Sequence, residues 1–456
     1  MTECREPFVC EIASPPDPLA ACERLAHLRY RLLLDSAVTG ERQGRYSYLV
    51  ADPSCVIRAR GHRVDVQTAD GPWHETSGGL INEARQRLGR LRARHREDLP
   101  PFQGGIAGYV AYEWGRTLER LPPPRLDDLG LPDAVLGVYD WVIAWDHVAG
   151  GAWIVSTGRP DSDAGTWRRE AAERAEAVAA VLRDPIAKPV PSQSTPASVT
   201  VTACSSVPLL SDLGVRDGVV RSTFSADEYR RAVCRVRDYV HAGDLFQANL
   251  SQRFEAPLSE PPWSFYRRLR AHTPAPFGAY VELPDAAILS MSPERFLQVD
   301  PRGRVETRPI KGTRPRGVGP EHDAALGPAL LASDKDRAEN LMIVDLMRND
   351  LSKVCAAGSV RVSELFAVER YATVHHLVST VVGALQPGAD ALSLLHAAFP
   401  GGSVTGAPKV RAMEVIAELE PTARGVYCGS IGYWGFSGAS DTSIAIRTAV
   451  AKDGRV

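Results

Sequence analysis

The sequence predicts an α+β fold with large antiparallel sheets. Strand-like segments follow one another directly, as at 277–283 and 286–299, and short polar turns separate them. Helical segments occur singly, at intervals, rather than after every strand. A regular strand–helix–strand alternation would instead predict a parallel sheet. Because 456 residues are too many for one simple core, we expect two or three cooperating lobes.

The composition is that of a soluble globular protein. Hydrophobic residues make up 44% of the chain, charged residues 24%, and the net charge is −2. This balance gives no sign of a nucleic-acid or acidic-membrane partner. No apolar run approaches the ~20 residues of a membrane span, and the N-terminus lacks the pattern of a secretory signal. The eight cysteines are scattered and form no CxxC pair, so we expect reduced thiols in a cytoplasmic enzyme.

Residues 1–183 are predicted to form an N-terminal lobe. A helix begins near residue 20 and runs into a strand at 32–34. The glycines of 104–116 lie among aromatic residues, which indicates close sheet packing rather than a phosphate loop. Further elements are expected as strands at 45–50, 55–60 and 63–68, helices at 81–97 and 163–183, and a hairpin formed by 135–147 and 152–158. Residues 184–216 are rich in Pro, Ser and Thr, which predicts a long surface connection.

Residues 217–456 are predicted to form the catalytic domain. Ser225 and Glu228 make a capping box that begins a helix. Helices are also expected at 262–270, 336–351 and 391–399, and strands at 246–254, 277–283, 286–299, 428–436 and 441–451. A glycine-rich loop at 400–407 precedes another helix, and Pro408 suits its first turn.

Lys311 is the first candidate catalytic residue. Only six of the 53 Lys and Arg residues are lysines, so arginine fills most places where a generic positive charge suffices. An amine can lose its proton and attack carbon, whereas a guanidinium cannot. Gly312 follows it and permits a ligand to approach the backbone closely. A nucleophilic lysine needs a partly desolvated position. The alternative is an ordinary lysine on a solvated loop.

Two features suggest anion binding. The free amide groups and the positive dipole end of the helix after Pro408 face the glycine-rich loop, which suits a carboxylate. Arg447 lies in an alternating strand, where a charged group needs an anionic partner. A substrate carboxylate would satisfy it. An ordinary helix start and a structural ion pair are the alternatives.

Three acidic or titratable residues complete the candidates. Glu339 follows Asp336 at i+3 spacing, so both carboxylates share one helical face and offer the oxygen ligands that Mg²⁺ prefers. A solvated helix face is the alternative. Glu294, after a proline at a strand end, and His376, before a hydrophobic strand, are candidate general acids.

The sequence resembles the chorismate-utilising enzymes. The resemblance rests on ordered blocks in both parts of the chain. They are LLLDSAVTGERQGRYSYLVADP, GGIAGYVAYE, GDLFQANLSQRF, SPERF, TRPIKGTRPRG, DRAENLMIVDLMRNDLSKV, HHLVSTVVG, FPGGSVTGAPKVRAMEVI and RGVYCGSIGYWG. The resemblance implies that the large antiparallel sheets pack as a sandwich flanked by helices.

The resemblance also implies a reaction. Family members that aminate chorismate at C4 have lysine in Pro-Ile-Lys-Gly-Thr, whereas anthranilate synthases usually have alanine there. The water-activating lysine of isochorismate and salicylate synthases is replaced by Gln247. We therefore expect conversion of chorismate and ammonia to 4-amino-4-deoxychorismate, for p-aminobenzoate and folate synthesis. An anthranilate synthase is the enzymatic alternative. A non-catalytic tryptophan-binding regulatory homologue is the alternative of another class.

Individual roles follow from the resemblance. Lys311 would attack C2 of chorismate while Glu294 protonates the departing hydroxyl, and His376 would lie near the enolpyruvyl group. Glu339 would bind Mg²⁺. A separate glutamine amidotransferase subunit would supply ammonia, since the chain shows no glutaminase motif. The expected substrate-binding residues are Gly312, Thr313, Ser403, Tyr427 and Arg447, and the expected tryptophan-binding residues are Ser36, Pro276, Phe277 and Gly278.

Family sequences continue beyond the position of Val456 with a glycine-rich strand and a glutamate-bearing helix. The resemblance implies that this segment supplies a second metal carboxylate. We therefore expect the 456-residue chain to bind chorismate and Mg²⁺ weakly, and the segment 441–451 to lie at an uncovered sheet edge.

Overall fold

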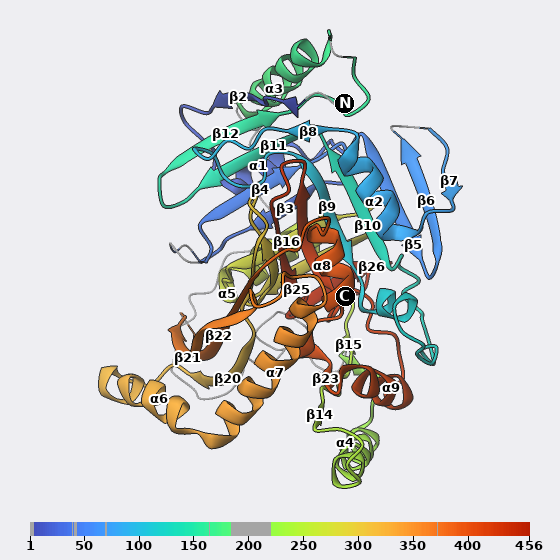
Figure 1. The fold of residues 1–456 in the computed structure, drawn as a ribbon, viewed down its shortest axis with the longest axis vertical. Helices are drawn as coiled ribbons and strands as arrows, with labels where there is room; N and C mark the ends of the chain where they lie inside the picture. The colour runs from blue at the N-terminus through green and yellow to red at the C-terminus, as the bar shows by residue number, and fades with distance from the viewer. Residues whose placement is uncertain are drawn as a thin grey trace.

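Two antiparallel sheets, packed face to face and covered by helices, form the framework of the computed structural model (Figure 1). The structure describes residues 4–38, 40, 43–68, 71–163, 165–183, 220–371 and 373–456. The predicted connection at 184–216 lies outside these residues. None of the helices in the described ranges is long and apolar enough to cross a membrane. The seven cysteines in these ranges are free thiols.

The first sheet has eight strands in the order β2-β12-β11-β4-β3-β16-β17-β26. Aromatic and aliphatic runs such as WVIAWD suit strands that are buried on both faces. The strands are β2 Phe8–Glu11, β3 Leu32–Asp35, β4 Tyr46–Val50, β11 Trp141–Asp146, β12 Gly151–Ser156, β16 Phe277–Glu282, β17 Ala286–Ser292 and β26 Thr448–Lys452.

The second sheet has twelve strands, in the order β20-β22-β19-β18-β25-β24-β9-β10-β5-β6-β7, with β21 also paired to β22. Gly108 in β9 has φ +156°, and a Cβ there would lie 2.0 Å from the Val135 carbonyl oxygen, so the glycines allow the expected close sheet packing. The strands are β5 Cys55–Arg60, β6 Arg63–Thr68, β7 His74–Thr76, β9 Gly105–Val110, β10 Ala134–Tyr139, β18 Arg295–Val299, β19 Arg304–Thr307, β20 Ile310–Pro315, β21 Arg361–Arg370, β22 Val374–Ala384, β24 Ser430–Gly435 and β25 Ser440–Ile444.

Helices cover the outer faces of both sheets. One core joins the eight-stranded sheet to α1, α3 and α5, a second fills the space between the sheets, and a third joins the twelve-stranded sheet to α2, α7, α8 and α9. The predicted α+β sandwich flanked by helices is therefore confirmed. The helices are α1 Pro18–Arg24, α2 Gly79–Gly89, α3 Trp167–Arg183, α4 Ala226–His241, α5 Pro262–His272, α6 Pro320–Ala332, α7 Asp334–Ser352, α8 Ala391–Ala398 and α9 Lys409–Leu419, with 3-10 turns η1 Tyr112–Thr117 and η3 Gly402–Val404.

Each large sheet takes strands from both sides of the 184–216 connection. In the twelve-stranded sheet β9 pairs with β24, and in the eight-stranded sheet β3 pairs with β16. The division into 1–183 and 217–456 stays a prediction from the sequence. It does not correspond to a division between the sheets.

The chain changes sheets at three places that the sequence reading treated as continuous. β10 passes to β11 at Asp140, so 135–147 is not one arm of a hairpin. β17 passes to β18 at Pro293–Glu294, and β25 passes to β26 at 445–447, so the predicted strands 286–299 and 441–451 are each two strands. Strands that switch sheets make the corners of such sandwiches. β25 lies inside the twelve-stranded sheet, whereas β26 is the last strand of the eight-stranded sheet. The edge expected for 441–451 is therefore found for β26 and not for β25.

Two further segments differ from expectation. The predicted strand at 246–254 contains only the short strands β14 Gln247–Ala248 and β15 Phe254–Glu255, which pair with β23 Gly406–Ala407 and β13 Arg221–Ser222. In the rest of 246–254, hydrogen bonds of side chains and loops take the place of strand pairing. The helix predicted over 81–97 ends at Gly89, and β8 Arg92–Ala93 then pairs in parallel with β1 Cys4–Arg5.

Candidate active site

Lys311 lies on β20 with its amine directed toward the glycine-rich loop. Its Nζ donates to the carbonyl oxygen of Ser403, 2.8 Å away in η3. Burial lowers the pKa of Lys311, and the nearby Glu294, Glu339 and Cys428 partly oppose this effect. The amine is therefore easier to deprotonate than an exposed lysine, as a nucleophile requires.

Glu294 occupies one of the crossings between sheets and is 5% exposed. Burial raises its pKa from 4.5 to about 7, although the Ser403 hydroxyl, Lys311 and the amide of Ile310 each stabilise the charged carboxylate. The Ile310 N–H lies 3.4 Å from Oε1. A carboxyl group with a pKa near neutrality is suited to donate a proton at physiological pH.

The second crossing lies beside the first and carries Arg447. The Ile444 amide donates to the Glu294 carbonyl oxygen at 3.1 Å, and the Met291 amide donates to the Arg447 carbonyl oxygen at 3.0 Å. Arg447 has φ +50°, a conformation that turns the chain between the sheets. Its guanidinium forms no ion pair with any residue in the described ranges. Arg447 is exposed and its charge acts on His376, yet desolvation by the surrounding protein lowers its own pKa. An unpaired guanidinium in this place suits a carboxylate ligand.

His376 and Thr313 lie together on adjacent strands. The His376 Nδ1 is 2.8 Å from the Thr313 hydroxyl, while its Nε2 is buried and has no hydrogen-bond partner in the described structure. Burial, aided by the positive charge of Arg447, lowers the His376 pKa to about 4. The imidazole is therefore neutral near pH 7.

Gly312 lies on β20 between Lys311 and Thr313. Its φ is +95°, and a Cβ would come within 3.2 Å of atoms in Asp336, Leu330 and Leu377. Glycine is therefore required here both for its conformation and for space.

Tyr427 is half-buried next to Cys428, and this thiol together with burial raises its pKa above the usual range. Cys428 in turn is one of the groups that act on Lys311. Among the described residues, Tyr427 forms no direct hydrogen bond with Lys311 or Arg447.

Glu339 is half-buried on α7, close enough to influence the pKa of Lys311. Its neighbour Asp336 is engaged by Arg314 at 2.6 Å, whereas Glu339 has only a 3.9 Å ion pair with the exposed Lys335. Within the described residues, no group of three or more His, Cys, Asp and Glu side chains is placed to hold a metal ion. Glu339 alone fits the minimum for Mg²⁺, which keeps several waters and takes one or two protein carboxylates.

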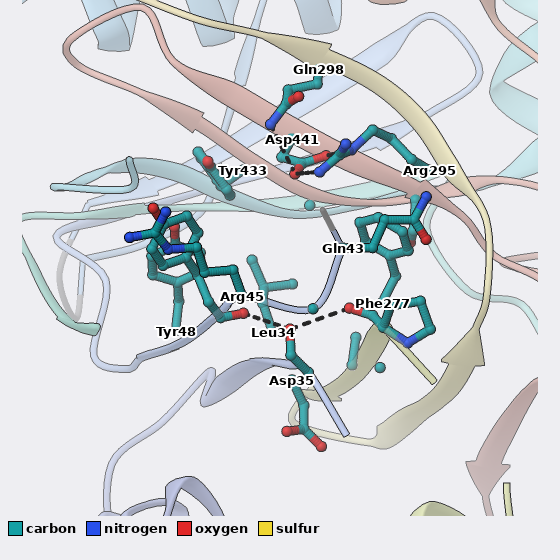
Figure 2. Close-up of a pocket in the computed structure, with 18 of the residues that line it drawn as sticks. Leu34, Asp35, Gln43, Arg45, Tyr48, Phe277, Arg295, Gln298, Tyr433 and Asp441 are labelled. Carbon is teal, nitrogen blue, oxygen red and sulfur yellow. Dashed lines mark hydrogen bonds and ion pairs between the residues drawn. The ribbon is translucent and has the colours of Figure 1, made fainter. Parts of the chain in front are cut away.

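The four expected tryptophan-binding residues line a different site. Ser36, Pro276, Phe277 and Gly278 border a cavity of about 380 Å³ between the two sheets. Figure 2 shows Arg295, Gln298, Tyr433 and Asp441 on one side of this cavity and Leu34, Arg45 and Phe277 on the other. Ser36 donates to the carbonyl oxygens of Tyr46 and Pro276.

Charged groups at this cavity are paired with protein partners. Arg295 holds Asp441 through two contacts of 2.9 and 3.0 Å and also Glu306 at 2.9 Å. The Asp35 carboxylate points away from the cavity (Figure 2) and accepts from Tyr266 on α5 at 3.0 Å.

Several residues that the sequence did not single out hold the glycine-rich loop in place. The Asn249 side chain donates to the Ser403 carbonyl oxygen at 2.6 Å, and Arg424 donates to the Val404 carbonyl oxygen at 2.9 Å. Gln247, read only as the replacement of a water-activating lysine, donates to Asn249 at 3.1 Å. The signal was the density of amide side chains in FQANLSQRF, which exceeds what a simple strand needs.

Comparison with known proteins agrees with this geometry. A family model described as chorismate binding enzyme matches residues 31–456. Aminodeoxychorismate synthase component 1 of Escherichia coli (strain K12) is 41% identical over 435 residues, which cover 95% of this chain and 87% of that protein. Anthranilate synthase component 1 of Cereibacter sphaeroides is 39% identical, over 96% of this chain and 85% of that protein.

A solved structure has the same fold. Anthranilate synthase component I from Streptococcus pneumoniae TIGR4 matches 92% of this chain and 88% of its own, with a TM-score of 0.72 and 29% identity. The match of the family model and the identity to these relatives over nearly the whole chain show that it belongs to the chorismate binding enzymes.

Proposed function

We propose that this chain aminates chorismate at C4 and forms 4-amino-4-deoxychorismate, the precursor of p-aminobenzoate. The observation that carries this proposal is the pair formed by Lys311 and Glu294. A half-buried amine with a lowered pKa faces the same loop as a buried carboxyl with a pKa near 7. Such a pair can supply a nucleophile and a proton donor.

The reaction follows in two displacements. The Lys311 nitrogen forms a bond to C2, the two conjugated ring double bonds shift, and the C4–O bond breaks as Glu294 gives its proton to the leaving hydroxyl. Ammonia then forms a bond to C4 while the C2–N bond breaks and returns the electron pair to Lys311. The balance is chorismate plus ammonia to 4-amino-4-deoxychorismate plus water.

Other residues would bind the dianionic substrate. The unpaired guanidinium of Arg447 suits one carboxylate, and the hydroxyls of Thr313 and Tyr427 add donors. The neutral His376 would contact the enolpyruvyl group through its unpartnered Nε2. Ser403 forms a hydrogen bond with each member of the catalytic pair: its carbonyl oxygen accepts from Lys311, and its hydroxyl donates to Glu294.

Glu339 would hold a Mg²⁺ ion, which supplies positive charge to a substrate carboxylate when it is bound. Ammonia would come from a separate glutaminase subunit, a proposal supported by the words "component 1" in the names of the relatives. These reactions would take place in the cytoplasm, where the free cysteines stay reduced.

The alternative product is anthranilate, because anthranilate synthases match this chain nearly as well. Lys311 favours amination at C4. The test is incubation with chorismate, MgCl₂ and ammonium, followed by chromatography and mass spectrometry of the product. We expect 4-amino-4-deoxychorismate, and anthranilate as the main product would overturn the proposal.

We also propose that the cavity between the sheets accepts tryptophan. The rings of Tyr48, Tyr433 and Phe277 offer contacts to an indole, and the cavity volume is suitable for one small ligand. Calorimetric titration with tryptophan tests this proposal. Saturable heat that is lost on Ala279→Trp, at a position of β16 that lines the cavity, is expected; absence of heat in the unmodified chain contradicts it.

A further inference from the structure

The Ser403 carbonyl oxygen accepts hydrogen bonds from two side chains. Lys311 Nζ lies 2.8 Å away and Asn249 Nδ2 lies 2.6 Å away. A carbonyl oxygen has two lone pairs, so these donors fill its usual capacity. The other end of the Asn249 amide accepts from Gln247 Nε2 at 3.1 Å, which fixes the orientation of the amide.

Asn249 is held rigidly by its own backbone. Its N–H donates to the Thr405 carbonyl oxygen at 2.8 Å, and its carbonyl oxygen accepts from Arg424 at 2.5 Å. Arg424 is 8% exposed, donates also to Val404, and is paired with Glu420 at 2.7 Å. These hydrogen bonds therefore join the segment that carries Asn249 to the loop that carries Ser403.

We propose that Asn249 is a positioning residue that holds the Lys311 amine in place by sharing its acceptor, the Ser403 carbonyl oxygen, and so favours its deprotonation. The inference rests on the proposed function, in which Lys311 is the nucleophile. An ammonium gains more from a carbonyl acceptor than a neutral amine does, because the charged hydrogen bond is stronger. A second donor draws electron density from the same oxygen and so reduces this advantage of the ammonium.

The charged and titratable groups around Lys311 make the effect testable. Glu294 at the sheet crossing, Glu339 on α7 and the Cys428 thiol each raise the Lys311 pKa, whereas burial lowers it. Asn249 contributes a neutral donor at this place. Replacing it by aspartate removes the donor from Ser403 and adds a negative charge, and both changes favour the ammonium.

The test compares Asn249→Asp and Asn249→Ala with the unmodified full chain. Each protein is labelled with an amine-reactive reagent across a pH series, and the modification of Lys311 is measured by peptide mass spectrometry. Lys335, whose side chain is 82% exposed, is the internal reference. Asn349→Asp, at an exposed position of α7, is the matched control.

We expect the midpoint of Lys311 labelling to move about one pH unit upward in Asn249→Asp and less in Asn249→Ala. The midpoint of Lys335 and the Asn349→Asp profile should not change. Unchanged Lys311 midpoints in both Asn249 variants would overturn the inference. If Asn249→Asp loses its circular dichroism spectrum, the Ala variant decides.

Turnover separates this inference from the proposed function. A higher Lys311 pKa should lower the plateau of the pH–rate profile about tenfold per pH unit and move its alkaline limb upward, because less neutral amine coexists with protonated Glu294. A shifted labelling midpoint in a chain that never aminates chorismate would support the role of Asn249 and refute the proposed function instead.

Discussion

Replacing Glu294 by glutamine should stabilise the protein at neutral and alkaline pH while it removes activity. Glu294 is 5% exposed, and burial raises its pKa from 4.5 to about 7. Above pH 7 the folded protein must hold a buried carboxylate. Glutamine has nearly the same shape and carries no charge, so it avoids this cost.

The magnitude follows from the pKa. A rise from 4.5 to about 7 corresponds to roughly 3 kcal/mol, at about 1.4 kcal/mol per pH unit. Since the folded state binds this proton more tightly than the unfolded state, the cost is absent below pH 4.5, grows from pH 4.5 to 7, and is complete above pH 7. The attraction to Lys311 is already included in the pKa of about 7, so we expect a gain of up to about 3 kcal/mol at pH 8.

Urea unfolding at pH 8 and at pH 4.5 measures the effect. The two proteins should converge at pH 4.5, and at pH 8 the variant should be the more stable one. Its kcat should fall about 10²–10⁴-fold, the usual contribution of a positioned acid. Glu321→Gln, at an exposed position of α6, should change stability by less than about 0.5 kcal/mol. A Glu294→Gln protein less stable than the unmodified chain at pH 8 would refute the reasoning.

Three further predictions concern the surroundings of this pair. Glu339→Gln should raise the Mg²⁺ concentration needed for half-maximal activity about tenfold or more without changing the unfolding midpoint, and an unchanged metal titration would make Glu339 a solvated helix residue. His376 should stay neutral from pH 9 down to about pH 5 because its pKa is about 4, and ring protonation near pH 6.5 in an NMR titration would contradict its burial beside Arg447. Gly312→Ala should cost about 1–3 kcal/mol and most of the activity, measured by urea unfolding and turnover, since φ is +95° and an added Cβ would lie 3.1–3.2 Å from side chains that would have to shift; a protein of normal stability would show that the loop adapts easily.

Much of the fold could be predicted from local patterns. Consecutive strand-like runs identified antiparallel sheets, and the capping box at Ser225 and Glu228 is present at the start of α4. The sheet crossings could not be predicted, because the strand-like pattern resumes directly after the polar Ser292–Arg295 and continues past the end of β25. The change of sheet depends on the packing of two layers, which no local period records.

The candidate site was predicted as a set of residue types rather than as a geometry. The scarcity of lysine and the neighbouring glycine singled out Lys311, and the structure brings Glu294 and Ser403 to it. The amide side chains of FQANLSQRF indicated a role beyond that of a strand, but the partners of Asn249 and Arg424 could not be predicted. These side chains bind main-chain carbonyl oxygens of the glycine-rich loop, which lies 154 residues from Asn249 and across α9 from Arg424. The cavity between the sheets likewise joins segments that meet only in the folded chain.

The covalent role of Lys311 is the central claim, and a trapping experiment tests it most directly. The full chain is mixed with chorismate and Mg²⁺ in the absence of ammonia, quenched in acid, and digested for peptide mass spectrometry. We expect an adduct with the mass of chorismate minus water on Lys311 and on no other lysine, and we expect it to disappear when ammonium is added before the quench. The covalent role would be contradicted by two results together. The unmodified chain would convert chorismate with ammonium without ever carrying this adduct, and the Lys311→Ala variant would be equally active.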